Sequence, residues 1–307
     1  MVQKSTGKTP TKRTKVVLGF DNEVYRVKTQ DGPNFIARIH RFGEIKPSQE
    51  VWAMEQSRKA GVPVPEVFFA GSINLPDGEH EAMVLSEVDG KPLSEIKSSL
   101  SNPELDRAHE SAGQVLRNIH SIKAGGFYHR QPDGVWDFST WESFIESAIK
   151  GRSAERSTIL DSGFSDDDFD FMINRLRFYG EEFPCHQPVL NHGDYEAGHI
   201  FVDKGLNVSG IIDFGMFQGA PAIHDFAFFT LFSKKEPLAN LEALIRGYGK
   251  HEMFDDRFEL RLNLHMLSLQ MGHLAHEAKQ GNDEDAKMIT ERLQRTLNTL
   301  KELKNGS

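Results

Sequence analysis

The segment of residues 189–227 constrains the fold of this chain more than any other stretch. Two short apolar or alternating runs inside it, residues 200–203 and 208–212, are typical of strands. The four residues between the runs include Gly and Asn, which tolerate the positive φ angles of a tight turn. The pattern therefore predicts a β-hairpin whose turn lies near Leu206.

This predicted hairpin brings three polar side chains together. With its turn centred near Leu206, the pairing register places His199 opposite Asp213 at the open end of the hairpin. Asp194 stands five residues before His199 and enters the same end. The sequence therefore predicts one site that contains two carboxylates and an imidazole.

These side chains suit phosphoryl transfer. That reaction needs a carboxylate that accepts the proton of the attacking hydroxyl, and ligands that hold Mg²⁺ against nucleotide phosphates. Protein kinases place the base Asp five residues before a metal-binding Asn, and D-F-G supplies a second metal ligand. Asp194 and His199 have this spacing, and residues 213–215 read D-F-G. We interpret Asp194 as the catalytic base, and His199 and Asp213 as metal ligands.

The same motifs resemble the aminoglycoside phosphotransferase and choline kinase-like superfamily, whose signature is H-G-D-x-x-x-x-N followed by I-D-[FW]. The resemblance implies an α+β, bilobal protein-kinase-like fold with a small antiparallel-sheet N-lobe and a larger, mostly helical C-lobe. We place these lobes at residues 16–88 and 89–307. We expect His192 to anchor the catalytic loop by hydrogen bonding and Asp225 to brace it.

Two departures from the signature concern the metal site rather than the fold. His199 replaces the usual Asn, and Ala220 replaces the first Asp of the family's G-D-P-x-x-D, of which Asp225 is the second. An imidazole is a softer ligand than an amide oxygen, and Mg²⁺ prefers hard oxygen donors. The sequence H-G-D-x-x-A-G-H is similar to macrolide phosphotransferases, whereas residues 127–185 resemble the hygromycin type.

The N-lobe supplies the predicted nucleotide contacts. Arg38 stands where kinases carry the phosphate-binding Lys, and the resemblance implies an ion pair between Arg38 and Glu50. Gly19 lies at the tip of a predicted hairpin that would cover the phosphates, and the main chains of Ser86 and Val88 would bind the purine. Taken without the downstream motif, Gly19 is an ordinary turn residue and Glu50 a first-turn acid favoured by the helix dipole.

Composition narrows the range of partners. The chain has 36 Lys and Arg against 45 Asp and Glu, a net charge of −9, which argues against a nucleic-acid partner. The acidic charge suits a cationic acceptor, although it equally serves solubility. Residues 1–15 hold five basic and no acidic side chains, and we predict a disordered basic arm there.

Other features bear on the compartment. No run of eighteen apolar residues exists, so we expect no membrane span. The N-terminus lacks the apolar region of a signal peptide, and the single cysteine, Cys185, fits a reducing cytoplasm. We expect a monomer or weak dimer.

The sequence thus favours a kinase that uses Mg²⁺ and ATP or GTP to phosphorylate a hydroxyl of an antibiotic-like acceptor, an aminoglycoside, aminocyclitol or macrolide. A metabolic alcohol kinase acting on choline, a sugar or an amino alcohol is one alternative. Another is a metal-dependent hydrolase that uses His192, Asp194, His199 and Asp213 as ligands, which leaves D-F-G and Arg38 without a role. A third is a nucleotide-binding pseudoenzyme, suggested by His199 and Ala220.

Overall fold

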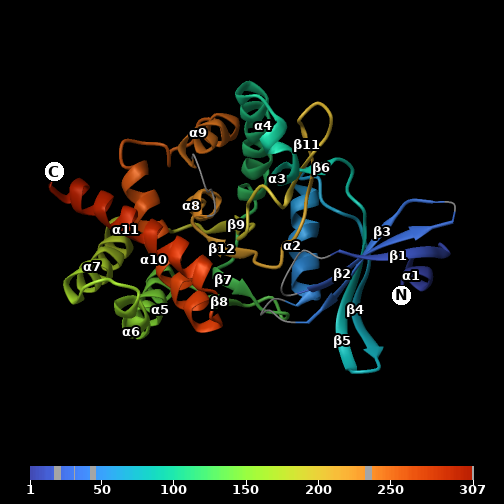
Figure 1. The fold of residues 1–307 in the computed structure, drawn as a ribbon, viewed down its shortest axis with the longest axis horizontal. Coiled ribbons are helices and arrows are strands. Elements are labelled where there is room, and N and C mark those ends of the chain that lie inside the picture. The colour runs from blue at the N-terminus through green and yellow to red at the C-terminus, as the bar shows by residue number, and fades with distance from the viewer. Residues whose placement is uncertain (17–21, 31, 42–45, 232–236, 306–307) are drawn as a thin grey trace.

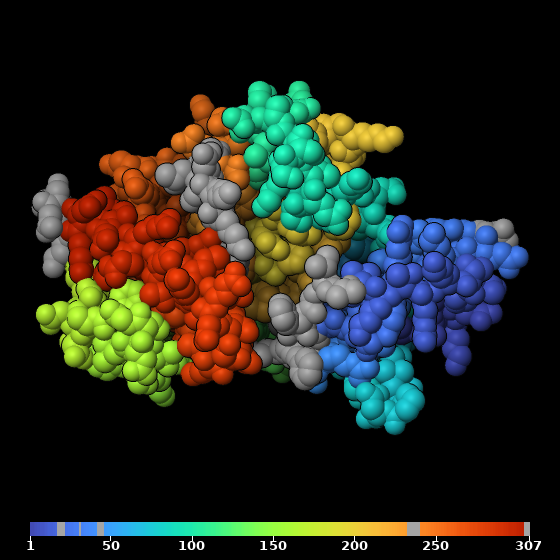
Figure 2. Space-filling view, in the orientation of Figure 1, coloured from blue at the N-terminus to red at the C-terminus, as the bar shows by residue number. Residues whose placement is uncertain are grey.

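The structure is a computed structural model that describes residues 1–16, 22–30, 32–41, 46–231 and 237–305. The chain folds into two lobes (Figure 1), and the predicted α+β, bilobal kinase-like fold is confirmed. In the space-filling view, a hollow opens between the blue N-terminal lobe and the orange-red helices of the other lobe (Figure 2). The floor of this hollow has the yellow and olive colours of the segment that carries the predicted catalytic motif.

The N-lobe is built on a five-stranded antiparallel sheet of order β1-β2-β3-β5-β4. Its strands are β1 (Pro10–Val16), β2 (Asn22–Thr29), β3 (Phe35–His40), β4 (Val67–Leu75) and β5 (Gly78–Ser86), and the helix α2 (Pro47–Lys59) follows β3. Arg38 on β3 lies opposite Val24 on β2 and Met83 on β5. Directly opposite residues share a face of the sheet, so the Arg38 side chain leaves the sheet beside two apolar neighbours.

The prediction of a disordered arm at residues 1–15 is wrong. Residues Val2–Thr6 form the helix α1, and β1 pairs with β2 as the edge strand of the sheet. Val2 is buried in a small core with Val27, Phe35 and Val84. The residue pattern does not reveal this strand. An edge strand is held by main-chain hydrogen bonds, and the side chains of β1 are almost all exposed and form no apolar face.

Two small sheets of the C-lobe frame the predicted site. One, of order β11-β10-β6, contains β6 (Lys91–Pro92), β10 (Ile200–Val202) and β11 (Val208–Ile211). The other, of order β8-β7-β12-β9, contains β7 (Phe127–Arg130), β8 (Trp136–Phe138), β9 (Val189–Asn191) and β12 (Gln218–Ala220). The loop that carries Asp194 runs from β9 to β10, and the loop that carries Asp213 runs from β11 to β12. Both loops therefore pass from one sheet to the other at the same place.

The rest of the C-lobe is helical. Its helices are α3 (Leu93–Ile96), the 3-10 turn η1 (Lys97–Ser99), α4 (Asn102–His120), α5 (Trp141–Ala154), α6 (Arg156–Asp161), α7 (Asp166–Glu182), α8 (Ile223–Leu231), α9 (Pro237–Tyr248), α10 (Phe258–Gln280) and α11 (Asp283–Asn305). Helix α4 begins with a capping box in which Ser101 and Glu104 bond each other's backbone. Its apolar face, which includes Ala108, Ala112 and Leu116, is fully buried, so α4 is a core helix.

The predicted hairpin forms as β10 and β11, but its register differs from the prediction. Ile200 lies opposite Ile211, and a bulge follows Phe201, so His199 meets Ile212 rather than Asp213 across the ladder. A one-residue shift normally turns a side chain to the other face of the sheet. Here Asp213 follows the end of β11 and has a left-handed φ of 63°. The backbone therefore turns at this residue, and the Asp213 carboxylate still approaches the imidazole of His199.

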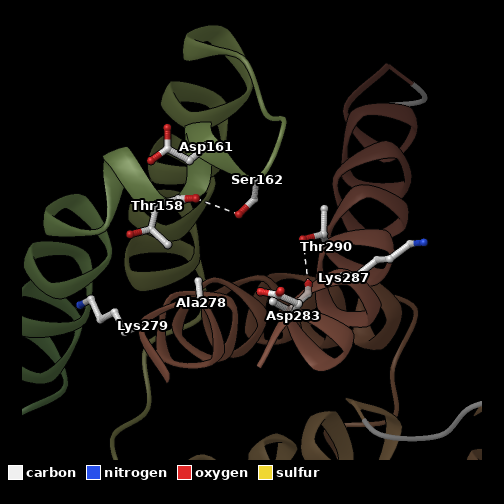
Figure 3. Close-up of a pocket in the computed structure, with 9 residues that line it drawn as sticks. Thr158, Asp161, Ser162, Ala278, Lys279, Asp283, Lys287 and Thr290 are labelled. Carbon is white, nitrogen blue, oxygen red and sulfur yellow. Dashed lines mark hydrogen bonds between the residues drawn. The ribbon is translucent and has the colours of Figure 1, made fainter. Parts of the chain in front are cut away.

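A pocket of about 550 Å³ lies between α6 and the turn that joins α10 to α11 (Figure 3). It is lined by Thr158, Asp161, Ser162, Ala278, Lys279, Asp283, Ala286, Lys287 and Thr290. None of these residues belongs to the predicted site, so this pocket is separate from it.

Candidate active site

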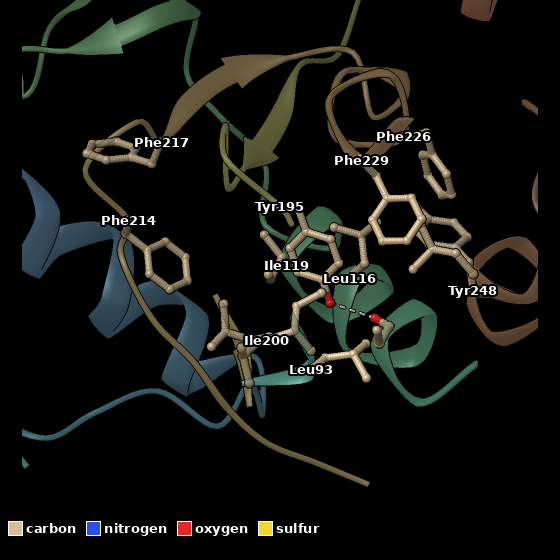
Figure 4. Close-up of a cluster of buried hydrophobic side chains, with 14 of the residues drawn as sticks. Leu93, Leu116, Ile119, Tyr195, Ile200, Phe214, Phe217, Phe226, Phe229 and Tyr248 are labelled. Atoms are coloured by element: carbon tan, nitrogen blue, oxygen red, sulfur yellow. Dashed lines mark hydrogen bonds between the residues drawn. The ribbon is translucent and has the colours of Figure 1, made fainter. Parts of the chain in front are cut away.

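A buried apolar cluster fixes the two loops of the site (Figure 4). Tyr195 follows Asp194 and Phe214 follows Asp213, and both aromatic side chains are fully buried. The Tyr195 hydroxyl donates a hydrogen bond of 2.7 Å to the carbonyl of Ala112 on α4. Each polar residue of the site is thus held by an aromatic neighbour that packs in the core.

His192 links the two loops. Its Nε2 lies 2.9 Å from the carbonyl oxygen of Ile212, and because a carbonyl only accepts, Nε2 carries the proton. Its Nδ1 accepts from the backbone N–H of Asp194 at 3.3 Å. Burial lowers the pKa of His192 to about 4, so the ring is neutral and both of its nitrogens are used within the protein.

Gly193 lies where the loops touch. Its φ is 82°, and a Cβ at this position would lie 1.8 Å from the carbonyl oxygen of Met216. Only glycine fits both the left-handed conformation and this close approach of two backbones.

Asp225 on α8 holds the catalytic loop from below. Its carboxylate accepts from the backbone N–H groups of His192 at 2.8 Å and Gly193 at 2.9 Å, and from Nε2 of His120 at 3.0 Å. Burial opposes ionisation, but the hydrogen bond from His120 and the neighbouring imidazoles keep the pKa of Asp225 below its usual value. This is the geometry that a brace for the loop requires.

The three predicted polar groups converge. The His199 ring lies between the two carboxylates, with Nδ1 at 3.4 Å from Oδ2 of Asp194 and Nε2 at 3.9 Å from Oδ2 of Asp213. Burial raises the pKa of Asp194, as do neighbouring carboxylates, against the opposing effect of His199. Burial lowers the pKa of His199, but the two carboxylates outweigh it and raise the pKa above its usual value.

The donor set fits a cation that is shared with phosphate oxygens. His199 Nδ1 donates to the carbonyl oxygen of Asp194 at 3.0 Å, so in the neutral ring, which is the form that binds a metal, the lone pair of Nε2 lies beside the Asp213 carboxylate. Within the described ranges, no group of three or more His, Cys, Asp or Glu side chains could enclose a metal ion. His199 and Asp213 stay the predicted ligands of Mg²⁺, which would take its other ligands from phosphates and water.

Arg38 joins the N-lobe to this site. It is buried and forms an ion pair with Glu50 of α2, whose side chain is also buried. Its Nη1 also lies 3.3 Å from Oδ1 of Asp213. Burial lowers the pKa of Arg38, and the Asp213 carboxylate opposes this shift. The structure thus brings together Arg38, Glu50 and Asp213.

The structure gives the surroundings of two of the three other predicted nucleotide-binding residues, Ser86 and Val88. Gly19 lies outside the described residues. Ser86 ends β5, where its N–H and its hydroxyl both bond the backbone of Glu66 at 2.9 Å. Val88 packs against Gly210, and its N–H has no hydrogen-bond partner among the residues that the structure describes. The purine-binding role of Ser86 and Val88 stays a prediction.

His120 is a site residue that no sequence pattern selects. It lies at the end of α4, 105 residues before Asp225, and its Nδ1 accepts from the Tyr248 hydroxyl at 3.2 Å. No periodicity or motif connects residues so far apart, so only the fold reveals this contact.

The comparison with known proteins agrees with this geometry. Residues 13–262 match the model of the phosphotransferase enzyme family. The chain belongs to this family. The chain is therefore a phosphotransferase that has an alcohol group as acceptor. The predicted membership of the aminoglycoside phosphotransferase and choline kinase-like superfamily is therefore confirmed.

Solved structures share the fold of this phosphotransferase. A thermostable mutant of aminoglycoside phosphotransferase APH(4)-Ia is 17% identical, with a TM-score of 0.76 and 97% of each chain covered. A putative fructosamine-3-kinase from Thermobifida fusca is 17% identical, with a TM-score of 0.67, and 97% of this chain and 96% of that chain are covered. No curated protein matches the sequence. No helix among the described residues is long and apolar enough to cross a membrane.

Proposed function

We propose that this phosphotransferase transfers the γ-phosphoryl group of ATP or GTP to a hydroxyl of a small acceptor. One observation carries the proposal: His199 lies between the Asp194 and Asp213 carboxylates, and Arg38 bridges Asp213 to Glu50. This arrangement pairs a base with a phosphate-binding and cation-binding group, as in-line phosphoryl transfer requires.

The geometry supports a separate role for each of these residues. Asp194 orients the acceptor hydroxyl and takes its proton, a task favoured by the raised pKa of this buried carboxylate. Arg38 holds phosphate oxygens, and Glu50 keeps the guanidinium in place. His199 and Asp213 would hold Mg²⁺, which when bound neutralises charge on the phosphates. The backbone of the loop is kept in register by Asp225.

Structures that share the fold support both kinds of substrate. APH(4)-Ia has been solved in a ternary complex with ADP and hygromycin B, and another aminoglycoside phosphotransferase with GDP and kanamycin. We therefore propose either an adenine or a guanine nucleotide as the phosphoryl donor of this chain. Met216 is exposed and lies against Gly193, the residue before Asp194. This supports an acceptor with carbon surface next to the reacting hydroxyl, such as an antibiotic sugar or macrolide.

A metabolic alcohol kinase is the second candidate. The putative fructosamine-3-kinase shares the fold over nearly the whole chain, at a TM-score of 0.67. A sugar-derived or amino-alcohol acceptor would use the same base and the same phosphate contacts, so the two candidates differ only in the acceptor.

The hydrolase alternative fits the site less well. It needs His192 as a metal ligand, but both ring nitrogens of His192 are engaged with the protein backbone. It also leaves the buried ion pair of Arg38 with Glu50 without a role.

The test is direct phosphorylation. The protein is incubated with Mg²⁺, ATP or GTP, and a panel of aminoglycosides, macrolides, sugars and amino alcohols, and phosphorylated product is detected by mass spectrometry. We expect Asp194→Asn to lower turnover by about 100-fold or more while nucleotide still binds. Nucleotide binding without any phosphorylated acceptor would instead indicate a pseudoenzyme. Substrate cleavage by water without nucleotide would indicate a hydrolase.

The setting of the reaction is also a proposal. The single cysteine, Cys185, supports a reducing cytoplasm, where nucleoside triphosphates are available. We infer that the enzyme works there as a monomer or weak dimer.

A further inference from the structure

Helix α2 is attached to the C-lobe through Trp52. The guanidinium carbon of Arg130, on β7, lies 4.4 Å from the centre of the Trp52 ring. The ring also meets Trp136 of β8 edge to face at 5.9 Å, and Phe217 at 5.8 Å. The Trp52 side chain of the N-lobe helix α2 therefore contacts three side chains of the C-lobe.

A second contact reinforces the first. The side-chain amide of Gln49 donates to the carbonyl oxygen of Arg130 at 2.6 Å. The amide oxygen of the same side chain accepts from the backbone N–H of Lys46 at 2.9 Å, which caps the start of α2. Gln49 is buried, so these bonds are shielded from water. The hairpin formed by β7 and β8 thus contacts the first turn of α2, and Figure 1 shows it reaching the same end of this helix.

These contacts connect α2, Arg38 and the loop after Asp213 to one another. Glu50 stands between Gln49 and Trp52 in α2 and forms the ion pair with Arg38. Arg38 reaches Asp213, and Phe217, four residues after Asp213, returns to Trp52. A shift of α2 away from the hairpin would therefore separate Glu50 from Arg38.

We propose that Arg130 is a positioning residue that acts through α2. Its guanidinium holds Trp52, and its backbone holds Gln49, so that Glu50 keeps Arg38 aimed at the phosphate side of Asp213. The inference rests on the proposed nucleotide-binding role of Arg38. No described carboxylate forms an ion pair with Arg130, so the Trp52 ring is its principal partner. The β7–β8 hairpin belongs to the sheet that also carries the catalytic loop, and the contact therefore ties α2 to the lobe that binds the acceptor.

The test compares nucleotide affinity in variants of the full chain. Arg130→Met removes the charge but keeps a long side chain. Because a cation–π contact of this kind changes an equilibrium by about two- to thirtyfold, we expect Mg·ATP or Mg·GTP to bind about fivefold more weakly. The KM for the nucleotide rises by the same factor, whereas the KM for the acceptor changes little. Arg130→Lys, which keeps a cation over the ring, restores most of the affinity.

A matched control separates positioning from general stability. The guanidinium of Arg175 lies 4.0 Å from the Phe178 ring, within α7 and away from the site. Arg175→Met removes a contact of the same kind far from the site and should leave nucleotide affinity unchanged, and the melting temperatures of both variants show how much each contact contributes to stability. In a Trp52→Leu background, Arg130→Met should have no further effect on affinity, because the shared contact is already lost.

The outcomes are distinct. Equal nucleotide affinity in the wild type and Arg130→Met overturns the inference and leaves the proposed function intact. Additive effects of Trp52→Leu and Arg130→Met also overturn it. A wild-type protein that binds neither Mg·ATP nor Mg·GTP refutes the proposed function itself. If Arg130→Met does not fold, Trp52→Phe, which keeps a weaker aromatic partner, gives the same comparison.

Discussion

The imidazole of His199 occupies the position at which related kinases carry an amide. In the neutral ring, the bond from Nδ1 to the carbonyl oxygen of Asp194 fixes the tautomer, and the lone pair of Nε2 is directed to the side of Asp213. A ring held in this way is a competent ligand, even though Mg²⁺ prefers oxygen. We therefore expect the substitution to change the Mg²⁺ dependence of the reaction rather than to abolish activity.

We expect His199→Asn to retain turnover and to lower the Mg²⁺ concentration needed for half-maximal activity, because an amide oxygen is a harder ligand. His199→Leu, which supplies no ligand, should raise this concentration by about tenfold or more. Titration of activity with Mg²⁺ measures both. Wild-type Mg²⁺ dependence in His199→Leu would show that the imidazole is not a ligand.

Asp225 offers a second test at the scale of one residue. In Asp225→Asn, one carboxylate oxygen becomes an NH₂ group that faces the N–H donor of either His192 or Gly193, and His120 loses its ionised partner. Breaking a buried charged network of this kind costs about 3 kcal/mol. Urea unfolding measures the loss, and the exposed Asp161→Asn serves as a control with no effect. A stable and fully active Asp225→Asn would contradict the bracing role.

At the scale of elements, the structure of the N-terminus differs most from what its composition indicates. A segment rich in lysine and threonine forms an edge strand because β2 offers it a free row of backbone groups, and α1 covers the neighbouring core with Val2. The basic side chains remain exposed on this edge, where charges discourage pairing with other chains.

This placement predicts that the N-terminus contributes to stability. Val2→Asp should lower the free energy of unfolding by about 2 kcal/mol, because the apolar side chain is nearly fully buried. Lys4→Ala, an exposed change in the same helix, should alter it by less than about 0.5 kcal/mol. Denaturant unfolding of both variants compares them. Equal stability of Val2→Asp and the wild type would mean that α1 is not packed in solution.

At the scale of the whole molecule, the C-lobe buries several neutral histidines. Burial lowers the pKa values of His109, His224 and His273 from 6.5 to about 4. His224 and His265 also bond each other at 2.9 Å, and Tyr179 bonds the far nitrogen of His265. The bonds of His265 to His224 and Tyr179 connect α10 to α8 and α7.

Acid should therefore unfold the protein in a defined window. The unfolded chain binds protons on these rings below about pH 6.5, whereas the folded chain does so only near pH 4. The contribution of these rings to the free energy of unfolding is fully present above pH 6.5 and is lost as the pH falls toward 4. Its slope is up to about 1.4 kcal/mol per pH unit for each ring.

Urea unfolding between pH 7 and 4 measures this slope. His109→Phe removes one titrating ring and should reduce the slope by up to about 1.4 kcal/mol per pH unit, the contribution of one proton. An equal slope in wild type and His109→Phe would mean that His109 titrates normally in the folded state.

Much of the site follows from local patterns in the sequence. Strand periodicity and turn residues predict the hairpin, and the spacing of Asp194, His199 and Asp213 predicts a kinase-like site, because these properties depend on neighbours along the chain. The resemblance adds the pairing of Arg38 with Glu50. The pairing register of the hairpin could not be predicted from the sequence, because the bulge after Phe201 depends on packing between β10 and β11.

The sequence by itself determined which chemical groups are present and how far apart they lie along the chain. Only the tertiary structure decided which distant groups meet. Asp225 with His120, and Trp52 with Arg130, are pairs of this kind. Such contacts arise when whole helices and sheets pack, and no local preference of either residue specifies the other.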